Sequence, residues 1–155
     1  MTIEELIGPE QVMVIPRATD KAALLRDLAV RAAPLVGIAP EAILEALQAR
    51  EKLGSTGLGK GFALPHARLA NLDHFFGLFA RLTKPVEFLA IDEQPVDLVF
   101  LLLIPAAAGN EHVAALAAIS RHFREAEFAA RLRKGKTPAE LYEVIAKSCV
   151  GSQKE

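Results

Sequence analysis

The chain has 155 residues, of which 52% are hydrophobic and 24% charged, and its net charge is −1. This composition is typical of one globular domain with a buried core, so we expect a single domain over residues 1–155. The near-neutral charge excludes the basic field of a nucleic-acid-binding protein. The longest apolar run, 98–108, is interrupted by a proline and is shorter than the ~20 residues that a membrane-spanning helix needs. The N-terminal MTIEELIGPE is acidic where a signal peptide is basic, so we expect a cytoplasmic protein without membrane insertion.

The first third of the chain predicts a strand followed by two helices. Residues 11–15 (QVMVI) are rich in β-formers and predict a strand. Leucines at helical spacing predict a helix from about 20 to 33, which we expect Pro34 to end. A second helix is predicted from Pro40, a residue suited to a first turn, to about residue 51.

The rest of the chain alternates between extended and helical patterns. FALPH (62–66) predicts a short extended piece terminated by its proline, and 76–82 alternates like a strand with unequal faces. VDLVFLLLI (96–104) is almost continuously apolar, which is typical of a strand covered on both sides. A helix is predicted from about Glu111, and the residues expected on its inner side are Val113, Leu116, Ile119 and Phe123. Two more helices are predicted, a short one around Phe128 and Leu132 and a last one that begins after Thr137. Helices interleaved with a buried strand indicate an α/β fold.

The glycine-rich stretch GSTGLGKG (54–61) matches the first seven positions of the P-loop pattern, but Gly61 stands where a magnesium-binding Ser or Thr is required. The glycines also follow a helix and lead into a strand, the reverse of the P-loop order, so we do not expect a nucleotide site. Two interpretations stay open: a helix C-cap with a tight turn, or a bare loop whose backbone N–H groups bind an anion.

Three polar residues form a candidate site near this loop. His66 directly follows Pro65, and a neutral imidazole nitrogen is a nucleophile that can accept and release a phosphoryl group. His112 is expected at the start of a helix that follows a buried strand, where ligands of α/β sheets bind, and Arg50 can supply a cation for phosphate oxygens. For each of the three, a purely structural role as a surface or capping residue stays open.

The other two histidines, His74 and His122, are expected on solvated surfaces. The sequence has no paired cysteines or other ligand spacing typical of a metal site, and we expect neither a metal nor another cofactor.

The stretch REKLGSTGLGKGFALPHARL (50–69) resembles the sequence around the active histidine of IIA domains of the phosphotransferase system (PTS), fructose/mannitol type (EIIA type 2). Within that family, it is most similar to the nitrogen-regulatory branch. The resemblance continues through AIDEQPVDLVFLLLIPA (90–106) and TPAELYEVI (137–145), and so covers nearly the whole chain. It implies a mixed β-sheet of about five strands flanked by helices on both faces.

The resemblance also implies an activity: reversible phosphorylation of His66 at Nε2 by a small HPr-like carrier protein (NPr), which enzyme I charges from phosphoenolpyruvate. The family's assisting residues fall on Arg50 and His112. Phosphoryl transfer mainly needs alignment and charge stabilisation, and backbone amides around Ser55 and Thr56 are expected to contribute donors without a metal.

Three functions follow as hypotheses. The leading one is a phosphorelay protein that reports its phosphorylation state to regulatory protein targets such as kinases or transporters. The alternative in the same chemistry is a sugar-PTS IIA subunit that passes phosphate to a fructose- or mannitol-type IIB domain. The alternative of another class is a docking module that is never phosphorylated. The sequence leaves a homodimer open and indicates no nucleic-acid partner.

Overall fold

The computed structural model describes the backbone of residues 2–153 and the side chains of residues 2–148. The helices are α1 (Ile3–Leu6), the 3₁₀ turn η1 (Pro9–Gln11), α2 (Lys21–Val36), α3 (Pro40–Lys52), α4 (Glu111–Phe123), α5 (Ala126–Lys134) and α6 (Pro138–Gln153). The strands are β1 (Val12–Ile15), β2 (Gly57–Gly59), β3 (Phe62–Ala63), β4 (His66–Leu69), β5 (Phe76–Val86) and β6 (Val96–Pro105).

One mixed sheet organises the chain. Its strand order is β1-β5-β6-β3-β2, and β4 pairs with β6 as well. β5 runs antiparallel to β6, whereas β1 is parallel to β5, and β3 and β4 are both parallel to β6. The predicted fold class is therefore confirmed, with parallel and antiparallel pairs in the same sheet.

β3 and β4 follow the same edge of β6 in succession, with Phe62 opposite Leu98 and His66 opposite Leu102. The predicted extended piece does end at Pro65, because β3 ends at Ala63, but the chain resumes pairing directly afterwards and His66 opens the strand β4. Pro65 interrupts the pairing because it lacks an N–H, but its carbonyl still accepts a bond from the Leu102 N–H. The strand β2 inside the glycine stretch was not predicted.

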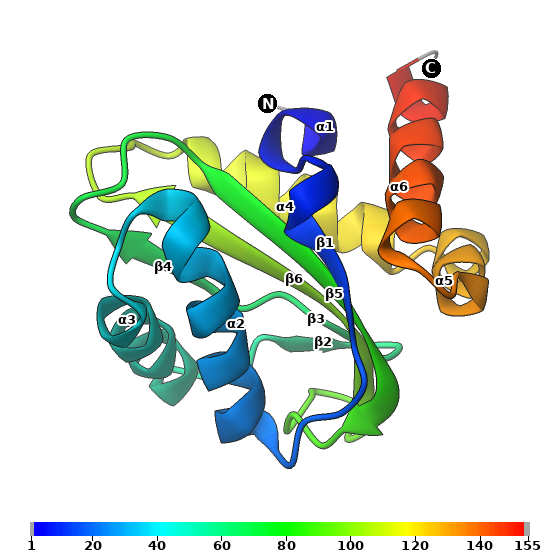
Figure 1. Ribbon diagram of the computed structural model, residues 1–155, viewed down its shortest axis with the longest axis horizontal. Helices are drawn as coiled ribbons and strands as arrows, with labels where there is room; N and C mark the ends of the chain where they lie inside the picture. Colours follow the sequence, from blue (N-terminus) through cyan, green and yellow to red (C-terminus); the bar gives the residue numbers. More distant parts are fainter. Residues whose placement is uncertain (1, 154–155) are drawn as a thin grey trace.

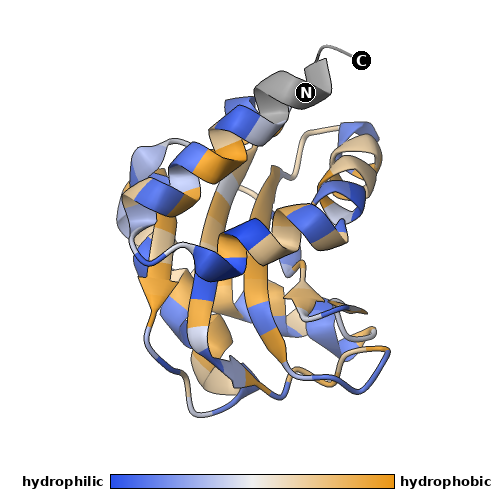
Figure 2. Ribbon diagram, turned by 90° about the vertical axis from the view of Figure 1, so that its right-hand side faces the viewer, coloured by the Kyte–Doolittle hydropathy of each residue, from blue (hydrophilic) through white to orange (hydrophobic). Residues whose placement is uncertain are grey.

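Helices cover both faces of the sheet and bury two separate cores (Figure 1). On one face, α2 and α3 pack through Leu24, Leu28, Ile43 and Leu47. On the other face, α1, α4, α5 and α6 bury a second core, in which the ring of Phe123 stacks on Phe62 and Phe79 with ring centroids 5.5 and 5.3 Å apart. Figure 2 shows hydrophobic residues along the strands beneath helices whose outer sides carry hydrophilic residues. β6 is buried along almost its whole length, as its apolar sequence predicts.

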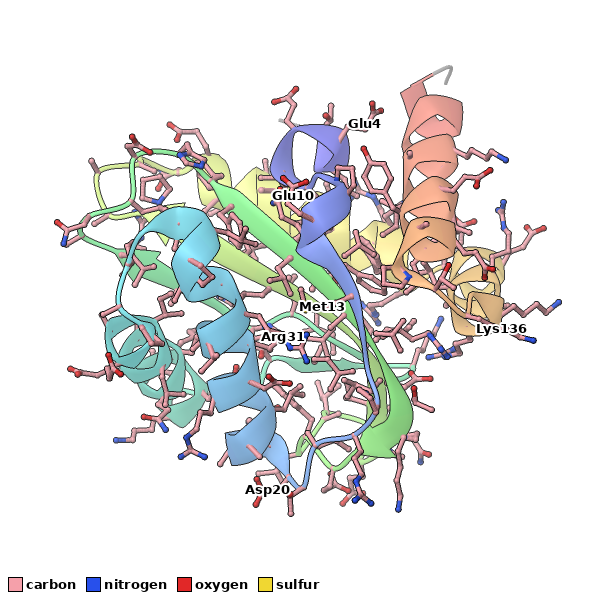
Figure 3. All side chains as sticks on the ribbon, in the orientation of Figure 1. Glu4, Glu10, Met13, Asp20, Arg31 and Lys136 are labelled. Carbon is pink, nitrogen blue, oxygen red and sulfur yellow. The ribbon has the colours of Figure 1, made fainter. Side chains whose placement is uncertain are left out.

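The helix α2 differs from its prediction at its C-terminal end. It begins at the cap Asp20, whose carboxylate accepts a bond from the Ala23 N–H and which is labelled at that end of α2 in Figure 3. The prediction that Pro34 ends the helix is wrong, because α2 continues to Val36. Proline's φ is already helical, so its cost is mainly one lost bond close to the terminus. Gly37, in the left-handed conformation with φ 71°, ends the helix instead.

On α4, the predicted inner side is correct except at one position. Ile119 and Phe123 are buried and Leu116 packs against the core, but Val113 is 59% exposed. The inward position one turn before Ile119 belongs to Ala115, which is buried, so the apolar stripe is narrower than predicted. Within the described residues, no helix is both long enough and apolar enough to cross a membrane.

Candidate functional site

Arg50, His66 and His112 meet at one cavity of about 500 Å³. Arg50 reaches it from the last turn of α3, His66 from the first position of β4, and His112 from the first turn of α4. The cavity is also lined by Arg68 and by an apolar wall of Ala46, Ala49, Leu53, Ala67, Ile104 and Leu116. The three residues that the sequence singles out are therefore neighbours in space, although 62 positions separate the outer two.

Two hydrogen bonds define the state of the His66 ring. Its Nδ1 lies 2.9 Å from the carbonyl oxygen of Leu64, and its Nε2 lies 3.2 Å from Nε of Arg50. A carbonyl can only accept and a guanidinium can only donate, so Nδ1 carries the proton and Nε2 presents its lone pair. The structure therefore assigns one neutral tautomer, with Nε2 as the nucleophilic nitrogen.

The surroundings of His66 favour this neutral form. Burial of the ring lowers the pKa of His66 below its ordinary value of 6.5, because a charged imidazolium loses solvation there. The bond to Leu64 opposes this shift, while the positive charge of Arg50 adds to it and that of His112 contributes a little more. At neutral pH the ring is thus available as a nucleophile.

The glycine loop begins as a helix cap. The N–H groups of Leu53 and Gly54 donate to carbonyls of the last turn of α3, and Gly54 has φ 149°. The carbonyl of Gly54 in turn accepts a bond of 2.9 Å from Nη1 of Arg50. This cap therefore helps to hold the guanidinium beside His66, and the C-cap interpretation of the glycines is confirmed.

Ser55 and Thr56, whose surrounding amides were predicted to bind phosphate, do not line the cavity. Thr56 is 2% exposed, and both its backbone N–H and its hydroxyl donate to the carboxylate of Glu51. The Ser55 hydroxyl donates to the carbonyl of Phe88 and accepts from the Gly57 N–H. The donors of Thr56 are thus used within the protein, contrary to the prediction, and for Ser55 only a contribution of its amide stays a prediction.

Glu51, which the sequence analysis missed, links the loop to α2. Besides Thr56, its carboxylate binds Nζ of Lys21 at 2.8 Å, and that ammonium lies 4.5 Å from the centre of the Phe88 ring. One indication of this role was present in the sequence, because Glu51 directly follows Arg50 and precedes the glycine loop. Its partner Lys21, however, is 30 positions away.

Arg68 is the second residue that the sequence analysis missed. Its guanidinium donates to the carbonyls of Ala108 and Gly109, at 2.8 and 3.0 Å, and lies 3.1 Å from Nδ1 of His112. Its position two residues after His66 was the available signal, because alternate residues of a strand point to the same side.

Both remaining histidines were predicted to lie on solvated surfaces, and this prediction is confirmed for His74 but wrong for His122. His74 is exposed and pairs with Asp73 at 2.6 Å, as expected for a surface residue. His122 is half-buried: its Nε2 lies 2.6 Å from the Ser148 hydroxyl, and its ring lies 4.3 Å from that of Phe128. Burial lowers its pKa. Its charged neighbours in the sequence misled the prediction, because Arg121, Arg124 and Glu125 are exposed whereas the His122 ring packs between Ser148 and Phe128. Among the described residues, no group of His, Cys, Asp or Glu is arranged to hold a metal ion.

The chain is similar to known proteins over most of its length. Residues 5–148 match the family described as "Phosphoenolpyruvate-dependent sugar phosphotransferase system, EIIA 2". A "Nitrogen regulatory protein" of Bradyrhizobium diazoefficiens is 44% identical over 146 residues, covering 94% of this chain and 95% of that protein. A protein of the same name from Pseudomonas aeruginosa is 38% identical over 144 residues, covering 92% and 94%.

The fold is also similar to solved structures. The crystal structure of the nitrogen regulatory protein IIA-Ntr of Neisseria meningitidis superposes with a TM-score of 0.84 at 32% identity, covering 92% of this chain and 98% of that chain.

Proposed function

The chain belongs to the EIIA 2 family of the phosphoenolpyruvate-dependent sugar phosphotransferase system, and from this premise we propose that it is a phosphorelay protein whose His66 is phosphorylated. The donor is an HPr-like carrier (NPr), and the phosphorylation state is read by regulatory protein targets. The observation that carries the proposal is the single tautomer of His66, with the Nε2 lone pair facing Arg50.

The transfer step follows from this geometry. The Nε2 lone pair of His66 attacks phosphorus on the carrier, and the N–P bond to His66 forms as the N–P bond to the carrier's imidazole breaks. His66 keeps its Nδ1 proton throughout, and the positive charge that develops on its ring is stabilised by the Leu64 carbonyl 2.9 Å away. This carbonyl acts here as the orienting acceptor does in other nucleophilic histidine arrangements.

Arg50 supplies the charge that the transferring group requires. Its guanidinium Nε lies 3.2 Å from the attacking nitrogen, so a small displacement brings it onto the equatorial phosphoryl oxygens. Phosphoryl transfer depends on such alignment and charge stabilisation. His112, on the same cavity wall, is the second group that can donate to those oxygens.

The relatives support a regulatory rather than a metabolic role. The two nitrogen regulatory proteins match over more than nine-tenths of their own lengths. The description of the family favours the sugar-uptake alternative, because it names a sugar phosphotransferase system. Transfer from the phosphorylated protein to a fructose- or mannitol-type IIB domain separates the two: absence of transfer supports regulation, and rapid, complete transfer supports sugar uptake.

Phosphorylation itself is tested with labelled phosphoenolpyruvate, enzyme I and the carrier. We expect His66→Ala to abolish incorporation of label. His74→Ala is the matched control, because His74 is exposed and outside the cavity, and it should be labelled like the wild type. Equal labelling of the His66 variant would overturn the proposal. No labelling of the wild type would favour the docking module.

A further inference from the structure

Arg68 holds the turn that carries His112. From β4 its guanidinium reaches the connection between β6 and α4, where Nη1 donates to the carbonyl of Ala108 at 2.8 Å and Nη2 to that of Gly109 at 3.0 Å. Longer contacts of 3.5 and 3.4 Å reach the carbonyls of Pro105 and Ala106. One planar fork thus reaches the carbonyls of four residues between positions 105 and 109, which a lysine ammonium could not match in geometry.

The same guanidinium determines which nitrogen of His112 carries the proton. Nη2 of Arg68 lies 3.1 Å from Nδ1 of His112. Arginine can only donate, so Nδ1 must accept, and the proton of the neutral ring is on Nε2. The competing arrangement, in which Nδ1–H donates to the Gly109 carbonyl, has a longer separation of 3.3 Å, and Arg68 already donates to that carbonyl.

We propose that Arg68 is a positioning residue that fixes His112 in its Nε2–H tautomer, so that His112 presents a donor to the phosphoryl group bound at His66. The two imidazoles of the cavity are then held in opposite tautomers. His66 exposes a lone pair at Nε2 because a carbonyl binds its Nδ1–H, and His112 exposes a proton at Nε2 because a guanidinium binds its Nδ1.

These opposite tautomers match the chemistry of the proposed phosphoryl transfer. The role of Arg68 in catalysis rests on that proposed function. One ring must attack phosphorus, and the other must stabilise the oxygens that gain negative charge. With the opposite tautomer, His112 would turn a lone pair toward the phosphoryl oxygens and repel them. Arg68 itself touches neither the nucleophile nor the phosphoryl group in this assignment.

Nitrogen NMR of the histidine rings tests the tautomer directly in the unphosphorylated protein. In mildly alkaline buffer, where imidazole is neutral, we expect Nδ1 of His112 to show a bare nitrogen and Nε2 a protonated one. In Arg68→Met the Gly109 carbonyl loses its donor, and we expect the Nδ1–H form to gain population. Arg121→Met, an arginine on the exposed side of α4, is the control and should leave the ring signals unchanged.

The proposal would be overturned if the His112 ring of the wild type were protonated at Nδ1. It would also be overturned if the tautomer populations of His112 were the same in Arg68→Met as in the wild type. If the Met variant does not fold, Arg68→Lys takes its place, because it keeps the charge but cannot bridge the carbonyls and Nδ1 together. Since this measurement needs no phosphoryl donor, its result does not depend on whether the relay itself exists.

A double-mutant cycle tests the catalytic consequence. We expect Arg68→Met to slow phosphoryl transfer by about tenfold or more, as is usual for a residue that orients a functional group. In a His112→Ala background, Arg68→Met should slow transfer no further, because its effect passes through His112. Slowing by the same factor in both backgrounds would show an independent role and contradict the proposal.

Discussion

Replacing Glu51 with alanine removes the carboxylate that ties the glycine loop to two helices. Its side chain is 7% exposed, binds Nζ of Lys21 at 2.8 Å and accepts two bonds from Thr56, one of them a backbone bond of 3.0 Å. Glu51→Ala leaves an ammonium and two donors of Thr56 without their acceptor. Lys21 is 16% exposed and Thr56 2%, so water replaces the carboxylate only in part.

The expected loss is large for a single substitution. Breaking a buried ion pair by removing one partner costs about 3–5 kcal/mol, and each unsatisfied buried donor about 1–3 kcal/mol. Lys21 keeps some access to water and its position over the Phe88 ring, so we take the low end, a fall of about 3 kcal/mol in the free energy of unfolding. For a chain of this length, this corresponds to a decrease of about 6–12 °C in Tm.

Urea unfolding followed by circular dichroism measures this loss. Glu45→Ala is the matched control, because Glu45 is exposed on the same helix, and its substitution should change the free energy of unfolding by less than about 0.5 kcal/mol. A loss of less than about 1 kcal/mol for Glu51→Ala would refute the reasoning, since Lys21 and Thr56 would then have been rehydrated at little cost.

Four further predictions concern Arg50, His66 and the glycine loop. Arg50→Ala should slow labelling of His66 by about a hundredfold without unfolding the protein, because a donor to the charged oxygens is lost; transfer at the wild-type rate would remove Arg50 from the mechanism. Burial lowers the pKa of His66 below its ordinary value, so the midpoint of the fall in rate with falling pH should lie below 6.5, because protonation removes the lone pair; a midpoint above 6.5 would contradict this. The unfolded chain binds the proton more readily than folded His66 does, so below pH 6.5 this residue should also make stability fall as pH falls. Gly57→Ala places a Cβ 2.8 Å from the backbone of Ala90 and should destabilise the fold by about 1–3 kcal/mol in urea, whereas a neutral effect would mean that the 88–92 loop moves freely.

Much of the fold could be predicted from local patterns in the sequence. The continuous apolar run of β6 predicts a strand buried on both faces, and β6 is indeed buried between the two helical layers. Pro40 correctly predicts the start of α3, because a proline in the first turn loses no hydrogen bond. These predictions succeed because burial and helix caps leave signals within a few residues of one another.

The failures arise where a distant partner decides the outcome. His122 is half-buried because α6 brings Ser148 against it. The end of α2 is an exception, because Gly37, which ends that helix, lies only three residues after Pro34. The roles of Glu51 and Arg68 depend on a lysine and a turn that lie 30 or more positions away in the chain. A single sequence contains no pattern that pairs such residues, so the grouping of His66, Arg50 and His112 could be predicted, but not the contacts that orient them.

The central claim is that His66 accepts a phosphoryl group at Nε2. NMR of the protein phosphorylated by the carrier, with nitrogen-labelled histidine, measures which ring nitrogen is bonded to phosphorus. Because the Leu64 carbonyl binds Nδ1–H in the structure, the phosphorus coupling should appear at Nε2 of His66 and at none of the other histidines. Coupling at Nδ1 of His66, or on a different imidazole, would contradict the account.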